Sequence, residues 1–308
     1  MNPSTPSSEI TFRTRFRAAL ELMRPANIIT AFADILAGVT IAAGSLVSSD
    51  LPFSEIGWLL LSTFGLYGGG VVLNDFFDAE LDAKERPERA IPSGRISAFT
   101  AGVFGFLLLL AGIVSAFLVN ITAGFLATGI AICAVFYDSK AKHSAFWGPL
   151  FMGSCRGGNL LLGISLIPAV VPEVWFLALI PLLYIASITL VSQGEVHGGS
   201  QAYGFTALGF ILLIVTAFLL LPLFELPFSL STALPFLVVF GVLVIPPFYK
   251  AAQNPVPSLI KTAIKRGVLS LVILNSVFAA GFGGFWSGMI VVLLFFLSVG
   301  TAKLFQVT

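Results

Sequence analysis

The sequence predicts an all-α protein, a polytopic bundle of nine or ten transmembrane helices. Of its 308 residues, 57% are hydrophobic and only 10% are charged, and the mean hydropathy is +1.00. Apolar runs long enough to cross the roughly 30 Å hydrocarbon core of a bilayer as helices recur along the whole chain. A chain of this composition does not fold around one aqueous core, so its expected solvent is lipid.

The apolar segments follow one another with short polar connections. They cover residues 27–47, 57–76, 98–119, 121–137, 145–168, 173–193, 203–222, 231–249, 266–285 and 288–304. Gly281, Gly283 and Gly284 lie at the junction of the last two, where the chain has little room for a turn. These two segments could therefore be separate helices or one interrupted unit, and the predicted count stays at nine or ten.

The chain is expected to contain one domain. Residues 1–22 begin with the polar stretch MNPSTPSSEITF, which lacks the apolar region of a cleaved signal peptide. They are predicted to form a disordered cytoplasmic tail, and residues 23–308 a single transmembrane domain. Cys133 and Cys155 lie in apolar segments without a CxxC partner, which favours buried structural thiols. No nucleic-acid motif is present, so no nucleic-acid partner is expected.

Basic residues gather on alternate connections. They precede the first segment and follow the second, fourth and eighth: Arg13, Arg15, Arg17, Arg24; Lys84, Arg86, Arg89, Arg95; Lys140, Lys142; Lys250, Lys261, Lys265, Arg266. The remaining connections carry only acidic charges, namely Asp50, Glu55, Glu173 and Glu225. The positive-inside rule therefore places the N-terminus in the cytoplasm. We expect an integral protein of a bacterial inner membrane.

An acidic stretch closes the second apolar segment. Asn74, Asp78 and Asp82 recur every four residues, so on a helix they share one stripe, with Asp75 about a quarter turn away. Oxygen ligands alone select a hard cation, and Mg²⁺ prefers a few carboxylates supplemented by substrate phosphates. The sequence predicts a Mg²⁺ site at these four residues. The alternative is that they form only the solvated end of a helix.

A basic loop follows directly, with Lys84, Arg86, Arg89 and Arg95 in a segment whose prolines prevent a continuous helix. Guanidinium groups bind phosphate oxygens, so acidic ligands beside a basic loop indicate a site for a metal together with phosphate. These cations also serve as topology signals, and the two roles are compatible.

These motifs resemble those of the UbiA superfamily of membrane prenyltransferases. The similarity includes the Arg24-Pro25 pair, the NDxxDxxxD of residues 74–82 and the RPxRAIPSG of residues 86–94. The resemblance implies a helical bundle with a lateral opening to lipid for the prenyl chain. It also implies that the Asn and Asp residues hold Mg²⁺ on a prenyl diphosphate, while the basic loop binds diphosphate oxygens.

The second acidic motif of that family is incomplete here. The matching stretch is VSQGEVHGG, in which Glu195 fits the second acid but Val191 stands at the position of the first Asp. Ser192, Gln193 or His197 could replace the missing ligand. The segment is also similar to UbiA-like EboC proteins of certain bacterial biosynthetic clusters. This departure motivates an alternative function, the transport or export of a lipophilic metabolite.

Polar side chains also occur within the apolar segments, where they are costly and usually functional. Arg24, Asn27 and Asp34 fall at helical spacing in the first segment, and Arg156 and Asn159 lie three apart in the fifth. Arg156 could form a structural ion pair with Asp34 or bind the diphosphate or the acceptor head group. The stretch Tyr137, Asp138, Lys140, Lys142 resembles the Tyr and Lys positions that lie near the substrate in the family.

The expected enzyme is a Mg²⁺-dependent prenyltransferase that moves a prenyl group from a prenyl diphosphate to an aromatic or other lipophilic acceptor. The expected catalytic residues are Asn74, Asp78, Asp82 and Glu195. The expected metal ligands are these four with Asp75, and the expected substrate-binding residues are Arg24, Asn27, Arg86, Arg89, Lys140, Arg156 and Asn159.

Overall fold

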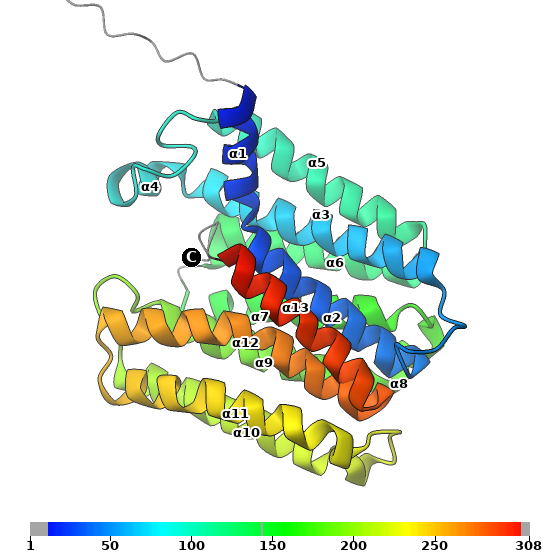
Figure 1. The fold of residues 1–308 in the computed structure, drawn as a ribbon. Coiled ribbons are helices and arrows are strands. Elements are labelled where there is room, and N and C mark those ends of the chain that lie inside the picture. Colours follow the sequence, from blue (N-terminus) through cyan, green and yellow to red (C-terminus); the bar gives the residue numbers. More distant parts are fainter. Residues whose placement is uncertain (1–11, 143, 303–308) are drawn as a thin grey trace, which may run out of the picture.

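A computed structural model describes residues 12–142 and 144–302, which form a bundle of α-helices without a strand in these two ranges (Figure 1). The first helices are α1 (Phe12–Met23), α2 (Pro25–Ala43), α3 (Phe53–Phe77), α4 (Ala79–Glu85), α5 (Ala98–Phe117) and α6 (Ile121–Phe136). They are followed by the π-helical turn η1 (Tyr137–Ala141), α7 (Trp147–Ile164), α8 (Val171–Val174), α9 (Leu179–Ser192), α10 (Gln201–Leu220), α11 (Leu230–Gln253), α12 (Pro257–Gly283) and α13 (Phe285–Ala302). The 3₁₀ turns are η2 (Pro168–Val170), η3 (Trp175–Ala178) and η4 (Leu221–Phe224).

Each of the ten predicted apolar segments overlaps mainly with one helix of the bundle. Within the described ranges, 8 helical segments are long and apolar enough to cross a membrane. The other two apolar segments correspond to α7, which contains Arg156 and Asn159, and to the shorter α13. Gly284 separates α12 from α13 with a φ of 82°, a conformation that glycine adopts without the penalty of a Cβ atom. The last two apolar segments are therefore two helices, and the all-helical transmembrane bundle is confirmed.

The N-terminal region differs from the expected disordered tail. Residues 12–22 belong to α1, while residues 1–11 lie outside the described part of the chain. Ala18 and Leu22 are buried in a cluster with Val72 and Ala101. One helical turn separates Ala18 from Leu22, so α1 has an apolar face that packs on the bundle. This apolar face was not predicted because it directly follows the polar first dozen residues.

Close backbone contact joins α2 to α7 in the centre of the bundle. A Cβ atom added at Gly163 would lie 2.5 Å from the carbonyl oxygen of Ile35, and one added at Gly38 would lie 2.5 Å from that of Leu160. Small residues permit such an approach between membrane helices. The contact brings the polar residues of the two helices together.

The basic connections share one end of the bundle. In Figure 1 the basic connections α3–α5, which includes α4, and α11–α12 lie at the left, together with the α9–α10 connection, which has no Lys or Arg. The connections α2–α3, α5–α6 and α10–α11 turn at the right. This arrangement agrees with the orientation predicted from the positive charges. The acidic stretch at the end of α3 lies at the left end, which is the predicted cytoplasmic end.

Candidate functional site

Arginine side chains from two separate segments meet the acidic stretch at the end of α3. Asp75 Oδ1 accepts from Arg24 Nη2 at 2.8 Å and lies 3.3 Å from Arg89 Nη1. The same Arg89 nitrogen lies 2.7 Å from Asp82 Oδ2. The loop after α4 therefore folds back toward α3, and the Arg89 guanidinium bridges the carboxylates of Asp75 and Asp82. Asp75 and Asp82 are both buried, so these ion pairs are shielded from solvent.

Arg24 reaches the site through an unusual backbone conformation. It precedes α2 as the N-cap residue, with φ 48° and ψ 69°, and Pro25 occupies the first helical position. A non-glycine residue in the left-handed region is uncommon, and such residues often occur at functional sites. The Arg-Pro pair thus begins the helix and directs the guanidinium toward Asp75.

The π-helical turn η1 supplies two further contacts to the same end of α3. Asn74 Nδ2 donates to Asp138 Oδ1 at 2.8 Å, and Lys142 Nζ forms an ion pair with Asp78. Asp138 is buried, with an exposed fraction of 4%. The sequence predicted no contact for Asp138, and it predicted Lys142 as a topology signal in a stretch that resembles family positions near the substrate. The matching spacing, four residues between Asn74 and Asp78 and four between Asp138 and Lys142, is the pattern that could have paired them.

Two other predicted substrate-binding cations have no partner in the described part of the chain. Arg86 is half-buried and Lys140 is exposed, and neither side chain makes a hydrogen bond or ion pair with any described residue. Arg95 instead contacts Glu21 of α1 at 2.5 Å, which ties the basic loop to the N-terminal helix. Arg86 and Lys140 are therefore available to bind an anion.

The donor groups suit a hard cation that is completed by another molecule. Within residues 12–142 and 144–302, no three His, Cys, Asp or Glu side chains lie close enough together to hold a metal ion by themselves. Asp78, Asp82 and the Asn74 amide supply only oxygen ligands from successive turns. Mg²⁺ is commonly held by one or two carboxylates and by substrate phosphates, so this set fits Mg²⁺ when a phosphate compound is present.

The second motif begins at the last two residues of α9 and continues into the connection that follows. Val191 is buried in the main hydrophobic cluster, as expected for an apolar residue in the place of an acid. The Glu195 amide donates to Ser192 O at 3.0 Å, and the Glu195 side chain is half-buried without a hydrogen bond or ion pair to a described residue. Glu195 joins no group of three potential metal-binding side chains in the described ranges, so its role as a ligand stays a prediction.

A second polar cluster lies deep in the bundle. Asp34 is fully buried; Arg156 Nε lies 2.7 Å from Asp34 Oδ2, and Asn159 Nδ2 donates to the same oxygen at 3.0 Å. Asn275 Nδ2 donates to Asp34 Oδ1 at 2.5 Å. The Arg156 guanidinium also lies 5.5 Å from the centre of the Tyr67 ring, within cation–π distance.

This deep cluster is separate from the site at the end of α3. Asp34 follows Arg24 by ten residues, which corresponds to about 15 Å along α2. Asn27, the other predicted substrate-binding residue of α2, is buried one turn after Arg24. The structure thus contains the Arg156–Asp34 ion pair, which was the structural one of the two interpretations of Arg156. The binding of substrate by Arg156 and Asn159 stays a prediction.

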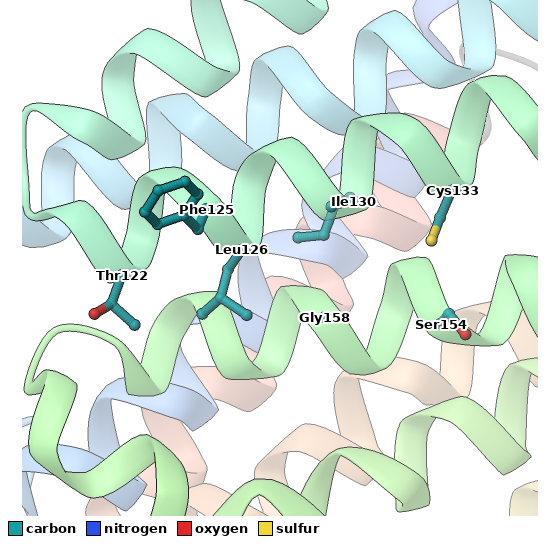
Figure 2. A pocket seen from close by; sticks show the side chains of 8 residues that line it. Thr122, Phe125, Leu126, Ile130, Cys133, Ser154 and Gly158 are labelled. Atoms are coloured by element: carbon teal, nitrogen blue, oxygen red, sulfur yellow. The ribbon is translucent and has the colours of Figure 1, made fainter.

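A largely apolar cavity of about 430 Å³ opens between α6 and α7 (Figure 2). Its lining residues are Thr122, Phe125, Leu126, Gly129, Ile130, Cys133, Ser154 and Gly158. Figure 2 shows the α6 side chains facing Ser154 and Gly158 of α7. Cys133 lies one helical turn before η1, so the cavity extends toward the polar site.

Parts of the chain are similar in sequence to known proteins. The chain is 34% identical to a digeranylgeranylglyceryl phosphate synthase of Methanosarcina mazei over 49% of this chain and 55% of that protein. It is 30% identical to the synthase of that name from Saccharolobus solfataricus over 75% of this chain and 84% of the relative. The match thus spans about half the length of the first relative and most of the second.

Solved structures share the fold. A UbiA homologue from Archaeoglobus fulgidus superimposes with a TM-score of 0.67 at 14% identity, covering 90% of this chain and 99% of that one. The same homologue has been solved bound to GPP and Mg²⁺, with a TM-score of 0.52 at 14% identity and coverage of 92% and 99%. The UbiA prenyltransferase family matches residues 33–255. This region includes the acidic stretch, the basic loop and η1, and the chain is an integral membrane protein that belongs to the UbiA prenyltransferase family.

Proposed function

We propose that the protein transfers a prenyl group from a prenyl diphosphate to a lipophilic acceptor at the cytoplasmic end of the bundle. The observation that carries this proposal is the meeting of an oxygen-rich stretch with cations from three segments. Arg24 precedes α2, Arg89 lies in the loop after α4, and Lys142 follows η1. Such a set can bind a polyanion and a hard cation together.

The chemistry breaks one bond and forms one. The bond between the allylic carbon and the diphosphate oxygen breaks, with its electron pair leaving on the diphosphate. The acceptor forms a bond to that carbon and loses a proton. Bound Mg²⁺ would stabilise the negative charge of the leaving group. Asn74, Asp78 and Asp82 would hold the ion, while Arg86, Arg89 and Lys142 would bind diphosphate oxygens and orient the substrate.

Mg²⁺ dependence is supported by the donor set and by the Archaeoglobus fulgidus homologue bound to GPP and Mg²⁺. The relatives suggest which acceptor to test first. The name digeranylgeranylglyceryl phosphate describes a glyceryl phosphate with two geranylgeranyl groups. We therefore propose a glyceryl phosphate that already carries one prenyl chain as the first acceptor to test, ahead of an aromatic compound.

The test measures diphosphate release from geranylgeranyl diphosphate by the purified full-length protein, with Mg²⁺ and acceptor present. Asp78→Ala is expected to lose at least a hundredfold in turnover, because it removes a proposed ligand of the Mg²⁺ ion that stabilises the diphosphate leaving group. The matched control is Glu80→Gln, which neutralises an exposed acid two residues away. Turnover that survives Asp78→Ala would overturn the proposal.

Replacing all three proposed metal ligands distinguishes enzymatic transfer from transport. A transporter that kept only the fold would move its lipophilic cargo equally well with Asn74, Asp78 and Asp82 all replaced by alanine. Vesicle export assays on that triple variant therefore distinguish the two functions. Unchanged export together with no prenyl transfer by the wild-type protein would favour transport.

A further inference from the structure

We infer that Asp138 is a positioning residue for the metal site: it orients the Asn74 side chain so that the amide oxygen points to the cation. The inference rests on the proposed function, since it assigns a partner to one of the proposed ligands. It concerns a residue that lies on η1, outside the acidic stretch of α3.

The geometry of η1 sets up this contact. The amide of Lys142 donates to the Tyr137 carbonyl at 3.0 Å, five residues back, which is the hydrogen bond of a π-helical turn. The turn presents Asp138 to Asn74 and Lys142 to Asp78. Asp138 of η1 and Lys142 directly after it thus contact two proposed ligands that lie four residues apart at the end of α3.

The chemistry of the contact fixes the orientation. A carboxylate oxygen accepts hydrogen bonds, whereas a carboxamide has one end that donates and one that accepts. The NH₂ end of Asn74 therefore faces Asp138, at 2.8 Å, and the oxygen end faces away. A hard cation binds the oxygen and is repelled by the NH₂ group. Without the Asp138 carboxylate, the Asn74 amide would lose the contact that distinguishes its NH₂ end from its oxygen end.

Burial protects the hydrogen bond between Asn74 and Asp138 from competition by water. Asp138 has an exposed fraction of 4%, so water competes weakly for its oxygen atoms. Its contact is to the nitrogen of Asn74, the end of the amide that cannot bind a cation. Asp138 therefore acts through Asn74, in the way that outer groups orient metal ligands in other proteins.

The experiment is a double-mutant cycle read by Mn²⁺ binding. Electron paramagnetic resonance of Mn²⁺ in the presence of inorganic diphosphate measures affinity without any turnover. Asp138→Asn in the wild-type background offers Asn74 an amide that can donate or accept, and about a tenfold loss of affinity is expected. Asn74→Asp alone also weakens binding, because two carboxylates then face each other.

The swapped pair gives the decisive result. In Asn74→Asp/Asp138→Asn the new amide donates to the new carboxylate, which keeps one oxygen for the cation. Asp138→Asn is therefore expected to lower affinity in the wild-type background and to raise it in the Asn74→Asp background. Glu80→Gln is the control, and thermal unfolding midpoints in detergent report whether each variant is folded.

Other outcomes overturn the inference in distinguishable ways. Loss of Mn²⁺ affinity on Asp138→Asn in both backgrounds would make Asp138 a direct ligand or a general source of negative charge. No change in either background would leave it without a positioning role. If wild-type protein binds no Mn²⁺ with diphosphate, the proposed function itself fails.

Discussion

Neutralising Asp34 tests whether the deep polar cluster is a buried ion pair that supports the bundle. Asp34→Asn preserves the volume of the side chain and removes its charge, which leaves the Arg156 guanidinium without a counterion in a fully buried position. Breaking a buried pair by removing one partner costs about 3–5 kcal/mol.

The contacts of the cluster place this variant at the lower end of that range. Asn159 keeps its hydrogen bond to Ala31 O at 2.9 Å, and Asn275 keeps its bond to Leu271 O at 3.0 Å. Thr30 also continues to accept from Arg156 at 2.9 Å. We therefore expect a loss of about 3 kcal/mol in the free energy of unfolding, roughly a hundredfold in the folding equilibrium.

The assay is unfolding by SDS in mixed micelles, followed by circular dichroism. Asp34→Asn/Arg156→Met removes both charges, and we expect it to recover most of the lost stability because no buried charge is left unpaired. The reasoning is refuted if Asp34→Asn costs less than about 1 kcal/mol, or if the double variant is as unstable as the single one. The KM of the double variant for prenyl diphosphate then shows whether Arg156 also contacts substrate.

Three further outcomes are expected. Lys142→Met removes the cation beside Asp78 and should raise the KM for prenyl diphosphate about tenfold, whereas Lys261→Met, on the exposed side of α12, should not. Gly163→Ala would bring a Cβ within 2.5 Å of Ile35 O and should cost about 1–3 kcal/mol in SDS unfolding, whereas Gly209→Ala meets open space. EDTA should stop diphosphate release and added Mg²⁺ should restore it; release that persists in EDTA contradicts a metal requirement.

The candidate site was predictable only in part. The acidic stretch, the basic loop and Arg24 are short-range patterns that can be read from the sequence, and the structure brings them together at the end of α3. The pairing of Asp138 with Asn74 and of Lys142 with Asp78 joins residues 64 positions apart, and local spacing does not reveal such contacts. The apolar face of α1 was missed because it begins where the polar N-terminal stretch ends.

The sequence by itself determined the membrane environment of the chain, and it predicts the orientation and the chemical character of the site. Hydrophobic length sets the number of possible spans, and loop charge sets which end faces the cytoplasm, so neither depends on how the helices pack. Only the tertiary structure decided that α12 and α13 are separate helices and that Arg156 pairs with Asp34. It alone placed η1 against the end of α3, because close packing between distant helices decides which polar groups meet inside a membrane.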